Sequence, residues 1–173
     1  MTFPALLIAW DRSRYLMWTW KDRLKLTNQQ VGRAGEAFVV SDVHRRGGYA
    51  TAFAGNMPAI DAFASDREPR RIVYLQIKTK TVGDWQTTAK HAARRTQVDN
   101  EDHFWVLVDI GKPAPEYFVV PQWWIQNWLF ETTKETVARR LAQGSTSTHA
   151  RIPPRAVESW RGAWHALGIF PAD

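Results

Sequence analysis

Three polar residues that could form a reactive site lie in segments that otherwise have the composition of a protein core. Asp61 is in the stretch MPAIDAFAS, and Gln76 and Lys78 lie two apart in the apolar run IVYLQIKTK. Burying a carboxylate, an amide or an ammonium group costs free energy unless the group finds a partner. The pattern therefore indicates a polar site that offers carboxylate and amide oxygens beside one positive charge.

The alternation of side chains along a strand places two of these residues on one face. Successive residues of a strand point to opposite faces, so Gln76 and Lys78 lie side by side, about 7 Å apart along the backbone. Asp61, one strand earlier, can reach the same end of the sheet. The opposite face of the strand is suited to the core, and it carries Val73, Leu75, Ile77 and Thr79.

A predicted helix brings a fourth polar residue, Glu36, towards the same place. Thr27 and Gln30 have the T-x-x-Q spacing of a capping box, which predicts a helix from there to about Arg46, before a Gly-Gly pair. The buried stripe of this helix consists of Val31, Ala34, Gly35, Phe38 and Val39. Glu36 lies about 100° around the helix from the residue before it, at the edge of the stripe, so it can point into a cleft beside the core.

The rest of the chain predicts strands and helices around one sheet. Three short segments rich in β-branched and aromatic residues predict an antiparallel meander: YATAFAG, AIDAFA and RIVYLQIKT. Residues 85–97 predict a helix, and HFWVLVDI and EYFVV predict two more strands. After them the sequence predicts a helix over QWWIQNWLF, another over 133–143, a loop at GSTSTHA and a closing amphipathic helix over RAVESWRGAWHALGIF.

The chain divides into a short extension and one domain. Residues 1–26 are basic and aromatic, and the i, i+4, i+8 spacing of Leu16, Trp20 and Leu24 predicts an amphipathic helix there. Residues 27–173 form the single domain. The apolar run FPALLIAW is too short to span a bilayer and lacks a basic leader, so we expect no export and no membrane span.

The composition favours a globular protein with an anionic partner. Of the 173 residues 45% are hydrophobic, which allows a real core. The absence of cysteine excludes disulfides and thiolate metal sites and favours the reducing cytoplasm. The net charge of +6 favours nucleic acid. The histidines lack zinc-site spacing and there is no glycine-rich phosphate loop, which disfavours zinc enzymes and nucleoside triphosphatases.

The order of these motifs resembles the PD-(D/E)XK nuclease superfamily. The sequence GRAGE in the helix, Asp61 after P-x-I, and Gln76-Ile77-Lys78 in the next strand carry the resemblance, over roughly 31–121. It implies an α/β (α+β) fold with a restriction-endonuclease-like core: a mixed sheet of about five strands in αβββαβ order, flanked by helices, with extra N- and C-terminal helices. The sequence departs from the motif in two places. Pro58 and Asp61 are separated by two residues, and Gln76 replaces the second acid.

The resemblance implies a Mg²⁺-dependent DNA endonuclease, with Mn²⁺ as an alternative ion. Asp61, Glu36, Gln76 and the backbone carbonyl of Ile77 would bind the metal, because Mg²⁺ prefers oxygen ligands. Lys78 would hold the attacking water or hydroxide and offset charge on the phosphate. A cut through both strands would require a homodimer or two binding events.

Clustered basic residues are the candidate contacts to DNA phosphates: Arg45, Arg46, Lys80, Lys90, Arg94 and Arg95. Two other functions stay open. Gln76 removes one negative charge from the metal shell, so the protein could be a nucleic-acid-binding module that has lost catalysis. The tryptophan-rich segments 1–26 and 123–130 also fit a protein-interaction domain, in which the polar cluster would be a hydrogen-bonded network.

Overall fold

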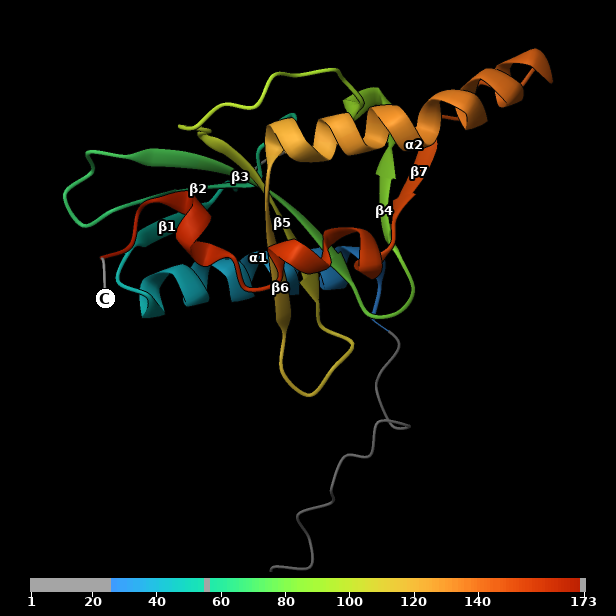
Figure 1. Cartoon of the computed structure of the whole chain (residues 1–173). Helices are drawn as coiled ribbons and strands as arrows, with labels where there is room; N and C mark the ends of the chain where they lie inside the picture. The colour runs from blue at the N-terminus through green and yellow to red at the C-terminus, as the bar shows by residue number, and fades with distance from the viewer. Residues whose placement is uncertain (1–25, 55–56, 172–173) are drawn as a thin grey trace, which may run out of the picture.

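The protein is built on one five-stranded mixed sheet (Figure 1). This computed structural model describes residues 26–54 and 57–171, so the helix predicted within residues 1–26 lies outside the described residues. The order in the sheet is β1-β2-β3-β5-β6, with β3 and β5 parallel and the other neighbours antiparallel. The predicted mixed sheet of about five strands is therefore confirmed. The strands are β1 (Tyr49–Ala52), β2 (Ala62–Ser65), β3 (Ile72–Lys80), β5 (His103–Asp109) and β6 (Glu116–Pro121).

Helix α1 (Asn28–Arg45) covers the face of the sheet formed by β1, β2 and β3. The predicted capping box is present: the backbone N–H of Gln30 donates to the Thr27 hydroxyl, and the Thr27 N–H donates to the Gln30 side chain. Apolar residues of α1 pack on the apolar face of β3, as the alternation predicted. The 3₁₀ helix η5 (Trp164–Leu167) and Ile169 complete this first core.

Helix α2 (Gln122–Ala142) covers the opposite face, over β5 and β6. Ile125 and Leu129 of this helix pack with Trp105 and Phe118 of the sheet in a second core. A separate two-stranded sheet of β4 (Trp85–Thr88) and β7 (His149–Ile152) joins this core. Within the described part of the chain, none of the helices has both the length and the apolar character needed to cross a membrane.

The prediction of a helix over residues 85–97 is wrong, and so is the second helix of the predicted αβββαβ order. The segment forms β4, the short 3₁₀ helix η3 (Ala89–His91) and a loop. Trp85 lies in the second core and its indole N–H donates to the carbonyl of Val108, 2.9 Å away. Pairing with β7, which follows 60 residues later in the chain, therefore overrides the local helical spacing.

The C-terminal third differs from the prediction in three respects. The two predicted helices over 122–143 are one continuous helix, α2. The predicted loop GSTSTHA ends inside β7. The predicted closing helix consists of two 3₁₀ helices, η4 (Pro154–Trp160) and η5. Gly162 and Gly168 have φ angles of 62° and 63°, outside the helical range of L-residues, and they interrupt the segment where the apolar spacing suggested a single helix.

Candidate active site

The candidate site lies where β3 continues past the first residue of its antiparallel neighbour β2. Residues 72–75 of β3 pair with β2, whereas residues 76–80 pair with β5 alone. Asp61 immediately precedes β2 and lies beside the part of β3 that does not pair with β2. Its Oδ2 accepts a hydrogen bond of 2.6 Å from the N–H of Ile77, and its own N–H donates to the carbonyl of Leu75. The carboxylate therefore takes the position of a missing strand partner.

The backbone carbonyl of Ile77 faces the same open edge. In a strand, the N–H and C=O of one residue point to the same side, and successive residues alternate. The carbonyl of Leu75 accepts from the N–H of Asp61, just before β2, while the carbonyl of Lys80 accepts from the N–H of Ile110 on the β5 side. Ile77 lies two residues after Leu75 in β3, so its N–H and C=O point to the same edge as those of Leu75. The N–H of Ile77 donates to the Asp61 carboxylate there. A peptide oxygen and the Asp61 carboxylate consequently share one edge of β3.

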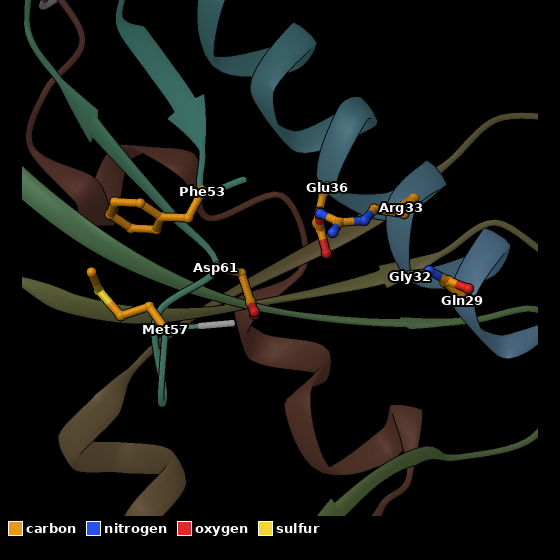
Figure 2. Close-up of a pocket in the computed structure, with 7 residues that line it drawn as sticks. All are labelled: Gln29, Gly32, Arg33, Glu36, Phe53, Met57 and Asp61. Carbon is orange, nitrogen blue, oxygen red and sulfur yellow. The ribbon is translucent and has the colours of Figure 1, made fainter. Parts of the chain in front are cut away.

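Glu36 approaches this edge from α1. Gly35 lies so close to β3 that a Cβ atom added to it would be 1.8 Å from Oγ1 of Thr79. This close approach brings Glu36, the next residue, to the border of a cleft of about 270 Å³, which Asp61 also lines. Figure 2 shows the two carboxylates bordering the cleft from α1 and from the segment before β2. Arg33 forms a 2.8 Å ion pair with Glu36. The remaining lining residues are Gln29, Gly32, Phe53 and Met57.

Gln76 and Lys78 lie on the face of β3 turned away from α1. Gln76 is in register with Trp105, and both belong to the α2 side of the sheet. Gln76 is 7% exposed and Lys78 is half-buried. Neither side chain makes a hydrogen bond or ion pair with any residue in the ranges 26–54 and 57–171. The structure thus brings Glu36 and Asp61 together at the cleft, whereas Gln76 and Lys78 lie on the other face of β3 and do not line it.

His91 is a neighbour of Lys78 that the sequence did not reveal. Its ring lies edge-on to Trp105, with centroids 5.1 Å apart, on the same side of the sheet as Gln76. Burial lowers the pKa of His91, and the positive charge of Lys78 lowers it further. Both effects favour the neutral form of the imidazole. Residues 85–97 were predicted as a helix, and a lone histidine gave no signal that it would fold over this strand.

Lys80 was predicted to contact phosphate from solvent, and the structure contradicts this. Its side chain is 8% exposed and forms a buried ion pair with Asp109. Its ammonium also lies 4.8 Å from the centre of the Trp85 ring. Asp109 accepts a second hydrogen bond from the N–H of Gly111. Lys80 is a structural residue because these groups surround its charge inside the protein.

The other basic candidates lie in two separate places. Arg45 and Arg46 are at the C-terminal end of α1, about 14 Å along the helix from Glu36 at 1.5 Å per residue, and both approach Asp42. Lys90, Arg94 and Arg95 lie in η3 and the loop after it. Arg94 stacks on Phe130 of α2, and Arg95 hydrogen-bonds to α2 through Asn127 and Gln126. The second group lies along the segment that carries His91.

A second carboxylate cluster, Glu101, Asp102 and His103, has ligand atoms within 4.8 Å of one another. Its hydrogen bonds are already used in the fold. Glu101 accepts from the N–H of Trp123 in the first turn of α2 and from the N–H of His103. The His103 side chain binds Asp102 and holds the pKa of that carboxyl below its usual range. This cluster therefore caps α2 and supports the start of β5.

At the open edge of β3, oxygen atoms of Asp61 and Ile77 lie together, and Glu36 borders the same cleft as Asp61. Asp61, Glu36 and the Ile77 carbonyl offer the hard oxygen ligands that Mg²⁺ and Mn²⁺ prefer. Lys78 adds a positive charge on the other side of the same strand. Comparison of the chain with protein-family models, curated proteins and solved structures found no match.

Proposed function

We propose that the protein is a metal-dependent endonuclease that hydrolyses phosphodiester bonds in DNA. The observation that supports this most directly is the convergence of Asp61, the Ile77 carbonyl and Glu36 at the open edge of β3. The PD-(D/E)XK-like motif and the net charge of +6 agree with it. A PD-(D/E)XK-type core and cytoplasmic location belong to the same proposal.

Each residue has a distinct part in the proposed reaction. Asp61, Glu36 and the Ile77 carbonyl would hold Mg²⁺ or Mn²⁺, with the Gln76 amide as a further neutral ligand. The bound ion supplies a water of lowered pKa and neutralises phosphate charge. Lys78 would orient the attacking water and stabilise the negative charge that grows on the phosphate. Arg33, which is paired with Glu36 at the mouth of the cleft, can turn its guanidinium to a phosphate oxygen.

The test is a cleavage time course on plasmid, branched and single-stranded DNA with Mg²⁺, Mn²⁺ or EDTA. We expect cleavage that depends on the metal, and a loss of about 100-fold or more in rate for Asp61→Asn and for Lys78→Ala. The matched control Asp99→Asn changes an exposed carboxylate in the loop before β5 and should cleave at the normal rate. Robust cleavage by both site variants, with folding intact by circular dichroism, would rule out this site.

Gln76 favours a second candidate function, a DNA-binding module without catalysis. It stands where the motif has an acid, and an amide binds a divalent ion more weakly than a carboxylate. This function predicts salt-sensitive DNA binding and no hydrolysis with either metal. The variant Gln76→Glu restores the acid: cleavage gained by this variant from an inactive parent would support the second function, whereas turnover by the unmodified protein would reject it.

A further inference from the structure

Among the described residues, the face of β1–β3 turned away from α1 carries several aromatic side chains. Helix α2 packs over β5 and β6, whereas α1 lies on the other face of β1, β2 and β3. The face of β1–β3 turned away from α1 carries a row of side chains that the strand register aligns. Thr51 is opposite Phe63, Phe63 is opposite Tyr74, and Tyr74 is opposite His103. We call the rings Phe53, Phe63, Tyr74 and His103 the aromatic band.

The four rings of the band form two contacting pairs, and one ring, Phe63, is exposed. Phe53 and Phe63 have centroids 5.8 Å apart, and Tyr74 and His103 have centroids 4.9 Å apart. Phe63 is 36% exposed, whereas Phe53, Tyr74 and His103 are half-buried. Exposed apolar surface that forms a contiguous patch marks a binding site more often than single exposed residues do.

The aromatic band is continuous with the candidate active site. Phe53, at one end, lines the cleft that contains Glu36 and Asp61 (Figure 2). Tyr74 lies on the same face of β3 as Gln76 and Lys78, and it is about 13 Å from Lys78 at 3.3 Å per residue. A nucleic-acid strand with its phosphate at Lys78 and Asp61 could therefore place neighbouring bases on the band.

We propose that the aromatic band stacks unpaired bases next to the scissile phosphate, so that the substrate is DNA with a single-stranded or branched segment. This inference rests on the proposed function. Aromatic rings suit bases, because every base has a π face and stacking on an aromatic side chain tolerates any sequence. Bases inside an intact duplex are stacked on each other and cannot reach such a surface. The Tyr74 hydroxyl and the His103 ring add polar groups for base edges.

The experiment measures binding in EDTA, where no cleavage occurs. Fluorescein-labelled single-stranded, forked and blunt duplex oligonucleotides are titrated with the full chain and its variants. We expect Phe63→Ala to weaken binding to single-stranded and forked DNA about tenfold, equivalent to about 1.4 kcal/mol, and to leave duplex binding unchanged. Phe63→Tyr keeps a ring and should restore the affinity. Val82→Ala, at an exposed apolar position in the turn after β3, is the control.

Several outcomes would overturn the proposal. One is equal binding of Phe63→Ala and the parent to all three DNAs. Another is equal weakening for duplex and single-stranded DNA. A third is self-association in sedimentation that Phe63→Ala abolishes without any effect on DNA, which would assign the band to a second copy. Because no step needs catalysis, an inactive protein with the expected binding pattern would contradict only the proposed endonuclease activity.

Discussion

Two lysines on the same face of β3 have different environments. Lys78 has no carboxylate partner among the described residues, while Lys80 is enclosed by Asp109 and Trp85. They are two residues apart, and the sequence gives no sign of the difference. The ion pair of Lys80 forms with the parallel neighbour β5, in which Asp109 is its register partner. Such a partner can be identified only once the strand order is known.

Removal of the buried cation should cost stability. Lys80→Ala leaves the Asp109 carboxylate buried without its partner, and we expect a loss of about 3–5 kcal/mol in the free energy of unfolding. Urea denaturation followed by tryptophan fluorescence measures it. The exposed control Lys90→Ala should stay within about 0.5 kcal/mol of the parent. A Lys80→Ala protein of normal stability but weakened DNA binding would instead support the original prediction of a phosphate contact.

His91 should make stability dependent on pH. Its pKa in the folded protein is below the ordinary value of 6.5, so between these two values the unfolded chain binds more protons than the folded one. The contribution of neutral His91 to the free energy of unfolding is therefore fully present above pH 6.5. It is lost as the pH falls from 6.5 towards the pKa of His91 in the folded protein. We expect Tm to drop less for His91→Gln than for the parent between about pH 7.5 and about pH 5.5. Equal drops would show that His91 is not held neutral.

At the scale of elements, α1 depends on a glycine at its contact with β3. In Gly35→Ala the new Cβ would meet Thr79 at its branch point as well as at its hydroxyl, so α1 must move outward. We expect a loss of about 1–3 kcal/mol in unfolding free energy, and a lower cleavage rate because Glu36 moves with the helix. Thermal unfolding and the cleavage assay measure the two effects.

Gly32 is the matched control on the same helix, one turn earlier. A Cβ added there meets no atom within 4 Å, so Gly32→Ala should stabilise the protein by about 0.5–1 kcal/mol through the smaller entropy loss of alanine. If both alanine variants were equally stable, the close contact between α1 and β3 would not be important for the fold.

Local signals predicted α1 and β3, but not the elements that depend on distant partners. The capping box at Thr27 and the alternation over β3 operate within a few residues, and the structure has both. In contrast, Trp85 has the spacing of a helical residue, and its pairing with Ile152 makes it a strand residue. The residues of the candidate site also divide into those with a local signal and those that depend on distant partners. Glu36 and Asp61 could be placed from a motif, whereas His91 depends on how β4 folds back.

At the scale of the whole molecule, the charge distribution predicts how DNA binding depends on salt. Arg94 and Arg95 lie together on the segment that joins η3 to β5, beside α2. If both contact phosphates, the double variant Arg94→Ala/Arg95→Ala should reduce the slope of log affinity against log salt by about 1.8, at about 0.9 per contact. Titrations of duplex DNA at several salt concentrations measure this slope.

Phe63→Ala provides the contrast, because it removes no charge. It should lower affinity for single-stranded DNA at every salt concentration and leave the slope unchanged. An unchanged slope in the double arginine variant would mean that these two arginines only support α2, and the phosphate contacts would have to be sought on other basic residues of the chain.

The first core is completed by the last described segment of the chain. Trp164, Leu167 and Ile169 cover the same sheet face as α1, and Arg71 donates hydrogen bonds to the carbonyls of Leu167 and Glu101. During translation, the synthesis of α1 and the first three strands is complete roughly 5 to 20 seconds before residue 169 is added. Throughout that interval an apolar surface on the nascent chain is uncovered. A ribosome stalled before Trp164 would consequently present a chain that chaperones can bind and proteases can degrade.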